Sequence, residues 1–187
     1  TFSFMLARFP FKGSGILIGL FFAGMMIPVH CTLIPLYNMM NMAGLIDHLW
    51  ALLFPYVASS LPIAVFLTYG HYQQLPKELE EAARIDGCSV TGMFFRVFLP
   101  LSKPVISTIS ILTALSAWNE FMFANVFLSD PNQKTLPIGL LALKGTYSTD
   151  YAALCAALTM SAVPIILVYV LMSNKIQSGM VAGAVKS

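Results

Sequence analysis

The sequence is poor in charge. Only 10% of its 187 residues are Asp, Glu, Lys or Arg, whereas 58% are hydrophobic, and the mean hydropathy is +0.79. Soluble domains contain about 25% charged and roughly 45–50% apolar residues. So few charges cannot coat a soluble domain of this length, and they leave no basic patch for nucleic acid. The composition excludes a soluble enzyme domain, a disordered chain and a nucleic-acid-binding protein, and it predicts an integral membrane protein surrounded by lipid.

Residues that form disulfides or hold metals are also few. The three cysteines are far apart and the three histidines stand alone: Cys31, Cys88 and Cys155, and His30, His48 and His71. Without a CxxC pair or a cluster of ligands, this spacing indicates neither a disulfide framework nor a zinc site. We therefore expect no metal, and we expect each cysteine to pack as a small apolar residue in or beside a helix.

Motifs for catalysis and nucleotide binding are missing as well. Residues 139–146 contain glycine, lysine and threonine in the order G-x4-K-G-T, which does not match the phosphate-binding loop GxxxxGK[ST]. No Ser-His-Asp set and no pair of carboxylates stands out in the sequence. We expect this chain to have no catalytic residue, to bind no cofactor and not to hydrolyse ATP itself.

Long apolar runs dominate what is present. About 20 apolar residues cross a bilayer as a helix, and four runs are long enough: Ser14–Tyr37, Leu49–Tyr69, Pro104–Leu128 and Tyr151–Met172. Prolines inside several runs predict bent helices, either packed around a pathway or bent for structural reasons alone. Residues 1–9 read as the end of an earlier span whose first part is missing. The expected fold is an all-α, polytopic helical membrane bundle with four full spans and the end of an earlier one.

The loop charges predict the orientation of these spans. Eight of the ten basic residues fall on one side, namely Arg8, Lys12, Lys77, Arg84, Arg96, Lys103, Lys175 and Lys186, and only Lys134 and Lys144 fall on the other. By the positive-inside rule the first side is cytoplasmic. We therefore expect a cytoplasmic loop at residues 73–103, an extracytoplasmic loop at residues 129–150, and a cytoplasmic C-terminal tail at residues 173–187.

The cytoplasmic loop has the sequence features of two short surface helices. Pro76 suits the first turn of a helix, acidic residues follow in the early turns, and Leu79, Ala82 and Ala83 share one face. Gly87 can end this helix in a left-handed conformation, and Ser89 can cap the next one. On these features alone, a solvated hairpin and a docking element are equally good interpretations.

The spacing in this loop resembles a known motif. Glu81-Ala82-Ala83, then Gly87, Val97 and Leu99-Pro100 at fixed offsets, is similar to the EAA loop of binding-protein-dependent ABC importer permeases, with Val97 in place of the usual isoleucine. The resemblance implies a coupling helix seated in a cleft of a cytoplasmic ATPase subunit. The residues assigned to that contact by the resemblance are Glu81, Ala82, Ala83, Arg84, Asp86, Gly87, Leu99 and Pro100.

The rest of the chain resembles the carbohydrate branch of the same family, near the second permease subunit of maltose-type importers. The segments concerned are ARFPFKGSG at 7–15, MIP at 26–28, LIPLY at 33–37, SAWNEF at 116–121, TLPIGL at 135–140 and AGAVKS at 182–187. The resemblance implies a multi-pass subunit in the plasma (inner) membrane of a bacterium or archaeon. It implies as partners an ATPase pair that binds ATP and Mg, a second permease subunit and an extracytoplasmic solute-binding protein. Transport would be by alternating access.

One carboxylate lies inside a predicted span. Glu120 follows Trp118 and Asn119, and a charge in the bilayer is costly unless it is paired or functional. Glu120 either bonds Asn119 or neighbouring backbone, or lines a sugar pathway with Trp118 and Asn119. Tyr56, Ser59 and Ser60 are weaker pathway candidates in the second span. In the outer loop, residues 145–148 are either a docking segment for the binding protein or an ordinary polar connector.

The sequence is also compatible with other functions. The motifs indicate the transport machine better than its cargo, so import of glycerol-phosphate or another polyol is an alternative to import of a sugar. A secondary transporter or channel subunit would need intramembrane coupling charges or inverted repeats, for which Glu120 alone is thin support. A membrane enzyme would need convergent catalytic residues, which the sequence lacks.

Overall fold

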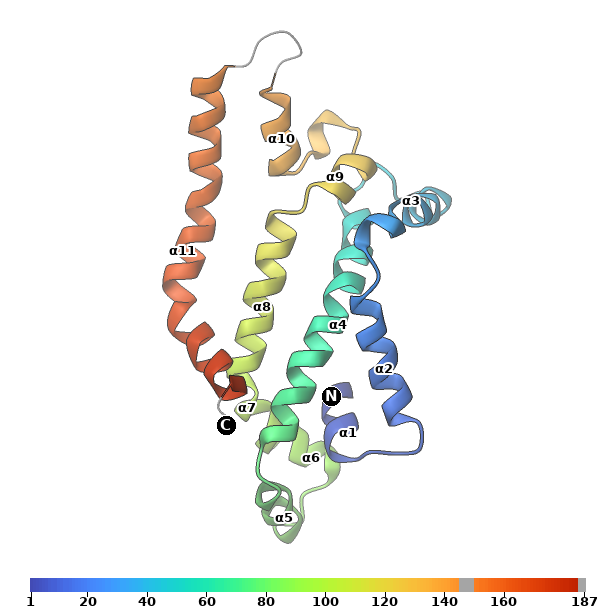
Figure 1. Cartoon of the computed structure of the whole chain (residues 1–187), viewed down its shortest axis with the longest axis vertical. Helices are drawn as coiled ribbons and strands as arrows, with labels where there is room; N and C mark the ends of the chain where they lie inside the picture. Colours follow the sequence, from blue (N-terminus) through green and yellow to red (C-terminus); the bar gives the residue numbers. More distant parts are fainter. Residues whose placement is uncertain (145–149, 185–187) are drawn as a thin grey trace. The chain divides into compact units, whose positions relative to one another are not determined.

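The structure is a computed structural model that describes residues 1–144 and 150–184, with backbone alone for residue 142 and residues 171–184. Within these ranges the regular elements are helices, drawn in chain order in Figure 1. The α-helices are α1 Phe2–Arg8, α2 Ser14–Met25, α3 Leu33–Met42, α4 Trp50–Gln74, α5 Glu78–Ile85, α6 Val90–Met93, α7 Leu99–Leu101, α8 Lys103–Trp118, α9 Met122–Phe127, α10 Leu136–Ala142 and α11 Tyr151–Ala184. The short 3-10 helices η1 and η3 cover Val29–Thr32 and Pro131–Gln133, and a π-helical segment, η2, covers Phe94–Phe98.

Two of the helices are long and apolar enough to cross a membrane, α4 over its whole length and α11 over Tyr151–Val170. Their most apolar stretches of 18 residues have mean hydropathies of 1.8 and 2.2. Both continue through internal prolines, Pro55 and Pro62 in α4 and Pro164 in α11. The second and fourth predicted spans are therefore single helices. The number of candidate spans rises to four when each of two bent helix pairs is counted as one span.

The first and third predicted spans are not single helices. In the first, α2 ends at Met25, and Pro28 has the extended dihedrals φ −62° and ψ 123° before η1 begins. Twelve residues rise only about 18 Å, against a hydrocarbon core of about 30 Å. In the third, α8 ends at Trp118 instead of continuing to Leu128, and α9 is a separate helix. The first predicted span is thus a pair of helices bent by 93°, in keeping with the bent helices that its prolines predict, whereas the helix of the third predicted span already ends at Trp118.

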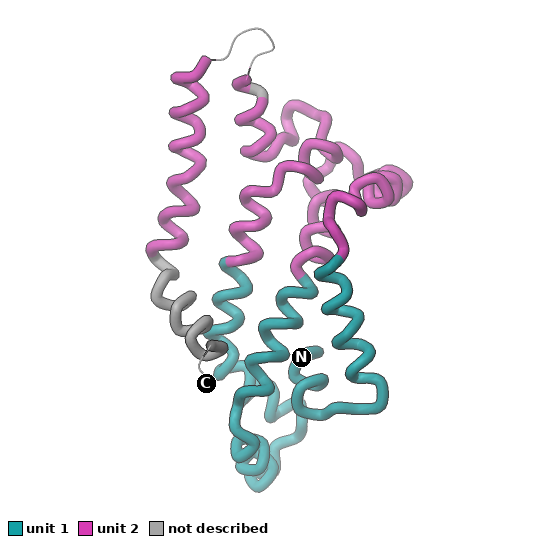
Figure 2. Tube along the Cα trace, viewed as in Figure 1, with its two compact units in different colours: residues 1–26, 61–111, 173–187 teal, residues 27–60, 112–172 magenta. Residues whose placement is uncertain are grey.

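The described chain divides into two compact units, coloured separately in Figure 2. Unit 1 comprises residues 1–26, 61–111 and 173–187, and unit 2 comprises residues 27–60 and 112–172. Each unit has a hydrophobic core of its own.

The core of unit 1 is aromatic and centres on Phe4 of α1, which is 1% exposed. The Phe4 ring lies 4.8 Å from that of Phe98, 5.3 Å from that of Phe94 and 5.6 Å from that of Tyr72, measured between centroids. Tilted and edge-on contacts at these distances are the favourable ones for aromatic rings. The N-terminal segment, predicted as the end of an earlier span, thus packs against the loop that follows α4.

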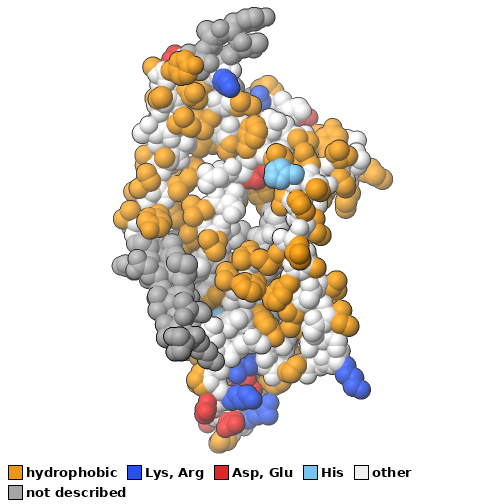
Figure 3. Space-filling model, viewed as in Figure 1, with side chains coloured by type: hydrophobic (Ala, Val, Ile, Leu, Met, Phe, Trp, Pro, Cys, Tyr) orange, Lys and Arg blue, Asp and Glu red, His pale blue; other side chains and the backbone are white. Residues whose placement is uncertain are grey.

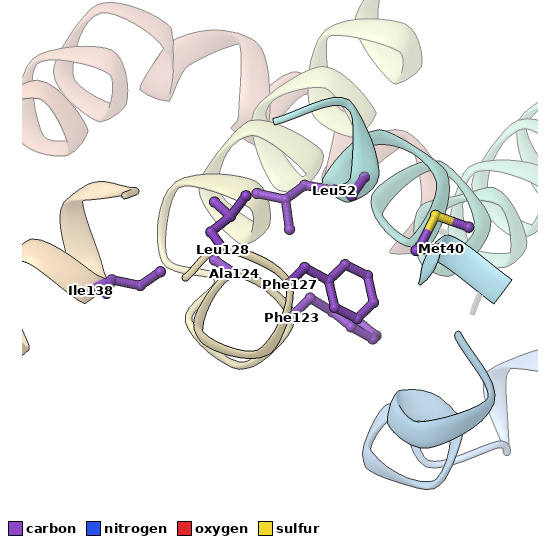
Figure 4. Packing of buried hydrophobic residues seen from close by; sticks show 8 residues of the cluster. Met40, Leu52, Phe123, Ala124, Phe127, Leu128 and Ile138 are labelled. Carbon is purple, nitrogen blue, oxygen red and sulfur yellow. The ribbon is translucent and has the colours of Figure 1, made fainter. Parts of the chain in front are cut away.

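The core of unit 2 is built around α9. Phe123, Ala124, Phe127 and Leu128 are buried and face residues of α3, α4 and α10, as Figure 4 shows. Hydrogen bonds of Asp47 also join the α3–α4 connection to the residues that follow α9. Asp47, at φ 62°, donates its N–H to the Phe127 carbonyl at 2.9 Å, and its carboxylate accepts the N–H groups of residues 129 and 130.

Candidate functional site

The surface helix α5 has one face against unit 1 and one face in solvent. Three acidic residues lie in its first turn, where the positive end of the helix dipole stabilises them. Ala83 is 4% exposed and packs with half-buried Leu79 against the aromatic core, whereas Ile85, on the opposite face, is 86% exposed. The sequence therefore folds here as a short amphipathic helix that presents its outer face.

The end of α5 is fixed by a glycine in the left-handed region. Gly87 has φ +71° and donates its N–H to the Arg84 carbonyl at 3.0 Å, while Cys88 donates to the Ala83 carbonyl at 2.9 Å. These two bonds form a Schellman motif. The Ser89 hydroxyl then accepts the Gly92 N–H at 3.2 Å and caps α6. The sequence predictions for Gly87 and Ser89 are confirmed.

An arginine from α1 supports the inner side of α5. The Arg8 side chain is 5% exposed, and its guanidinium pairs with the Glu80 carboxylate at 3.2 Å. The same group donates to the Leu75 carbonyl just beyond α4 and lies 5.4 Å from the centre of the Phe98 ring. In the sequence Arg8 is recognisable only as a loop charge, because nothing local links it to residues about 70 positions away.

The outer face of α5 carries the motif residues. The exposed side chains on this helix and its cap are Glu78, Glu81, Ala82, Arg84, Ile85 and Asp86. In the space-filling view of Figure 3, acidic and basic side chains gather over α5, in contrast to the hydrophobic surface of the longer helices. Further along the loop, Pro100 is exposed and Leu99 is half-buried. Of the predicted apolar face, Ala83 and Leu79 point inward, whereas Ala82 remains at the surface.

A second polar site lies in unit 2, where α8 ends and α9 begins. Glu120 accepts the Phe123 N–H at 2.7 Å on one carboxylate oxygen. Its other oxygen accepts the Ala124 N–H at 3.1 Å and the Tyr56 hydroxyl at 2.7 Å. The carboxylate thus satisfies two of the open N–H groups at the start of α9 and takes a third bond from α4.

The other predicted pathway residues do not bond to this pair. Asn119 donates to the Leu115 carbonyl at 2.8 Å, and Ser59 and Ser60 donate to the Tyr56 carbonyl at 3.2 and 2.7 Å. Trp118 is 41% exposed. The predicted bond between Glu120 and neighbouring backbone is therefore confirmed, and Asn119 as its partner was wrong, while a place for Glu120 in a solute pathway stays a prediction. Within the described residues, no group of three or more His, Cys, Asp or Glu lies close enough to hold a metal ion.

Comparison with known families decides the class of protein. Residues 1–178 match the family described as "Binding-protein-dependent transport system inner membrane component". The chain belongs to this family. The predicted recognition is thereby confirmed, and with it a helical membrane protein.

Named relatives of this transport family agree with the match. The chain is 44% identical over 181 residues to "Probable ABC transporter permease protein YurM" of Bacillus subtilis, covering 97% of the chain and 60% of that protein. It is 34% identical over 186 residues to "Trehalose/maltose transport system permease protein MalG" of Thermococcus litoralis, covering 98% and 66%. The chain therefore spans about three fifths to two thirds of the length of these relatives.

A solved structure shows that the fold is shared. The chain aligns with a TM-score of 0.77 and 22% identity to a structure described as "Crystal structure of a bacterial ABC transporter involved in the import of the acidic polysaccharide alginate". The alignment covers 92% of this chain and 65% of the other. The helical membrane bundle predicted from composition is thus the fold of an ABC transporter permease.

Proposed function

We propose that the chain is part of a permease subunit of an ATP-driven, binding-protein-dependent importer of sugars. The observation that carries the proposal is α5: an exposed, rigidly capped helix that holds Glu81 and Ala82 outward at the family's motif positions. The Schellman motif at Gly87 fixes the end of this helix, so that its outer face has a defined orientation. The family match and the carbohydrate cargo named for two of the similar proteins support the same function.

In this proposal α5 is the coupling helix. It docks into a cleft of a cytoplasmic ATPase subunit through Glu81, Ala82, Arg84 and Asp86, and closure of the ATPase pair moves the spans by alternating access. ATP and Mg bind the ATPase, and this chain contributes no catalytic residue or cofactor. A second permease subunit and an extracytoplasmic solute-binding protein complete the transporter.

The orientation follows from the loop charges. Residues 73–103 and the tail 173–187 face the cytoplasm, and residues 129–150 face the binding protein on the outside of the plasma membrane. The proposed docking segment at residues 145–148 lies outside the described residues. Within unit 2, Tyr56 and Glu120 are proposed to contribute polar groups to the solute pathway, together with exposed Trp118, Asn119 and Ser59.

The test exchanges a charge on the outer face of α5. Glu81→Lys removes a favourable interaction with the helix dipole worth about 0.3–1 kcal/mol, too little to unfold the membrane helices. Glu78→Lys is the matched control, because it makes the same charge change in the same first turn but lies outside the motif. We expect Glu81→Lys to insert normally, to lose the co-purifying ATPase subunit, and to abolish uptake of radiolabelled maltose and trehalose. Glu78→Lys should keep the ATPase bound.

Two results would contradict the proposal. The first is an ATPase subunit that stays attached to the Glu81→Lys permease, which would mean that α5 is only a solvated connector. The second is ATP hydrolysis by the purified permease without any partner.

A further inference from the structure

We propose that Arg8 is a positioning residue that makes α5 move as one body with the ends of α1 and α4. The inference rests on the proposed function only in its last step, where movement of α5 reaches the membrane helices. The anchoring itself stands on the contacts of unit 1.

One guanidinium joins the end of α1 to the α4–α5 region and to η2, which are both far from it in the sequence. Arg8 is the last residue of α1, and it pairs with Glu80 of α5 at 3.2 Å. It donates to the carbonyl of Leu75, the residue that follows α4, where open carbonyls and the negative end of the helix dipole favour a cation. It also lies over the ring of Phe98, which is fully buried. The three contacts fix α5 relative to α4 across the intervening turn.

Burial strengthens the electrostatic contacts of Arg8. Arg8 and Glu80 are 5% and 13% exposed, so neither charge is screened by much water. A buried ion pair that loses one partner leaves an uncompensated charge, which is strongly unfavourable. The planar guanidinium can donate in two directions and stack on a ring at once, which a lysine ammonium cannot do.

Loss of Arg8 should loosen α5 without unfolding it. The helix keeps its own cap at Gly87, and Ala83 and Leu79 still pack on the aromatic core. What disappears is the polar connection between α5 and the end of α4. The expected defect is therefore a helix that docks on the ATPase but no longer carries α4 with it.

Matched controls exist on the same segments. Lys12 lies four residues beyond Arg8 and is exposed, and Glu78 is exposed in the same turn of α5 as Glu80. Neither makes an ion pair in the described part of the chain. Lys12→Gln and Glu78→Gln therefore remove the same charges as Arg8→Gln and Glu80→Gln without touching the anchor.

The experiment measures the distance between two spin labels by pulsed electron paramagnetic resonance. One label is placed by Ile85→Cys on α5 and the other by Leu61→Cys on α4, where both side chains are exposed, in a background with the native cysteines replaced by alanine. In the purified permease without ATPase, Arg8→Gln and Glu80→Gln should broaden the distance distribution by about twofold, because local order of α5 is lost. Arg8→Lys should broaden it less, and the two controls should match the parent protein.

The second arm adds the ATPase subunits and Mg-ATP. In the parent protein the distance between the labels should stay constant when nucleotide is added, because α5 and α4 move together. In Arg8→Gln it should shift. The double variant Arg8→Gln/Glu80→Gln should behave as Arg8→Gln alone, since two residues that act as a pair are not additive.

If the distribution of label-to-label distances is as narrow in Arg8→Gln as in Lys12→Gln, the proposal that Arg8 anchors α5 is refuted. If Arg8→Gln does not insert, the comparison of Glu80→Gln with Glu78→Gln decides the question in the same way. If the distance between the labels also stays constant in Arg8→Gln when nucleotide is added, the proposed transmission from α5 to α4 is refuted. Failure of the proposed function has a different signature: no ATPase binds the parent permease, while the first arm still gives its result.

Discussion

Gly87 ends α5 in a backbone conformation that favours glycine. Its φ of +71° is in the left-handed region, which costs a residue with a side chain about 1–2 kcal/mol. A Cβ added at this position would meet no atom within 4 Å, so steric contact adds nothing to the cost of Gly87→Ala. The whole effect is backbone strain, and it acts on the bonds that end α5.

This strain should appear as faster hydrogen exchange at the Cys88 amide, which bonds the Ala83 carbonyl. If the end of α5 loses 1–2 kcal/mol of stability, the fraction of molecules in which this hydrogen bond is open rises about 5–30-fold. Gly87→Asn should have a smaller effect, because asparagine tolerates the left-handed region. Gly87→Pro should have the largest, since proline fixes φ near −65° and removes the N–H that bonds the Arg84 carbonyl.

The matched control is Gly44→Ala. Gly44 has φ +68° and open space around its Cβ position, so the strain is the same, but it lies in unit 2. We expect the amount of co-purified ATPase and the rate of uptake to fall least in Gly87→Asn, more in Gly87→Ala and most in Gly87→Pro. Both should be unchanged in Gly44→Ala. A Gly87→Pro permease that inserts and transports as well as the parent protein would refute the reasoning.

Two further predictions concern the membrane. A cysteine at Lys144 should react with an impermeant thiol reagent added outside intact cells, and one at Lys103 should react only after the membrane is opened; the reverse pattern would contradict the proposed topology. Glu120→Gln should lower the thermal unfolding midpoint of the purified permease more than Tyr56→Phe, because the charged carboxylate accepts three bonds, each worth about 1.5–3 kcal/mol, and Tyr56→Phe removes only one of them. A raised KM for uptake with unchanged stability would instead favour a role for the pair in solute contact.

Local features of the sequence predicted the surface loop well. The cap at Ser89 and the helix end at Gly87 depend on residues at most five positions apart, and both were predicted correctly. The same holds for α4, whose 25 residues include no Asp, Glu, Lys or Arg. A capping hydroxyl, a glycine and an unbroken apolar run each determine structure through neighbours in the chain.

Features that depend on distant partners were missed. The role of Arg8 depends on Glu80 and Phe98, which the chain brings close only when unit 1 is folded. The N-terminal segment was interpreted from its apolar residues as the end of a span, and nothing local showed that Phe4 would become the centre of an aromatic core. Hydropathy counts apolar residues but does not indicate which of them pack together.

The break at Glu120 explains why the third predicted span consists of two helices instead of one. Hydropathy continues from Pro104 to Leu128 almost without interruption, so length and composition alone favour one helix. A carboxylate is a strong acceptor, however, and in an apolar environment it must find donors. The nearest unpaired donors that a polypeptide can offer are the first N–H groups of a new helix. Ending α8 and starting α9 supplies Glu120 with the Phe123 and Ala124 N–H groups, and Tyr56 provides the third bond. A single acidic residue inside an apolar run is therefore not specific for a ligand contact, because it can equally indicate that a second helix starts there.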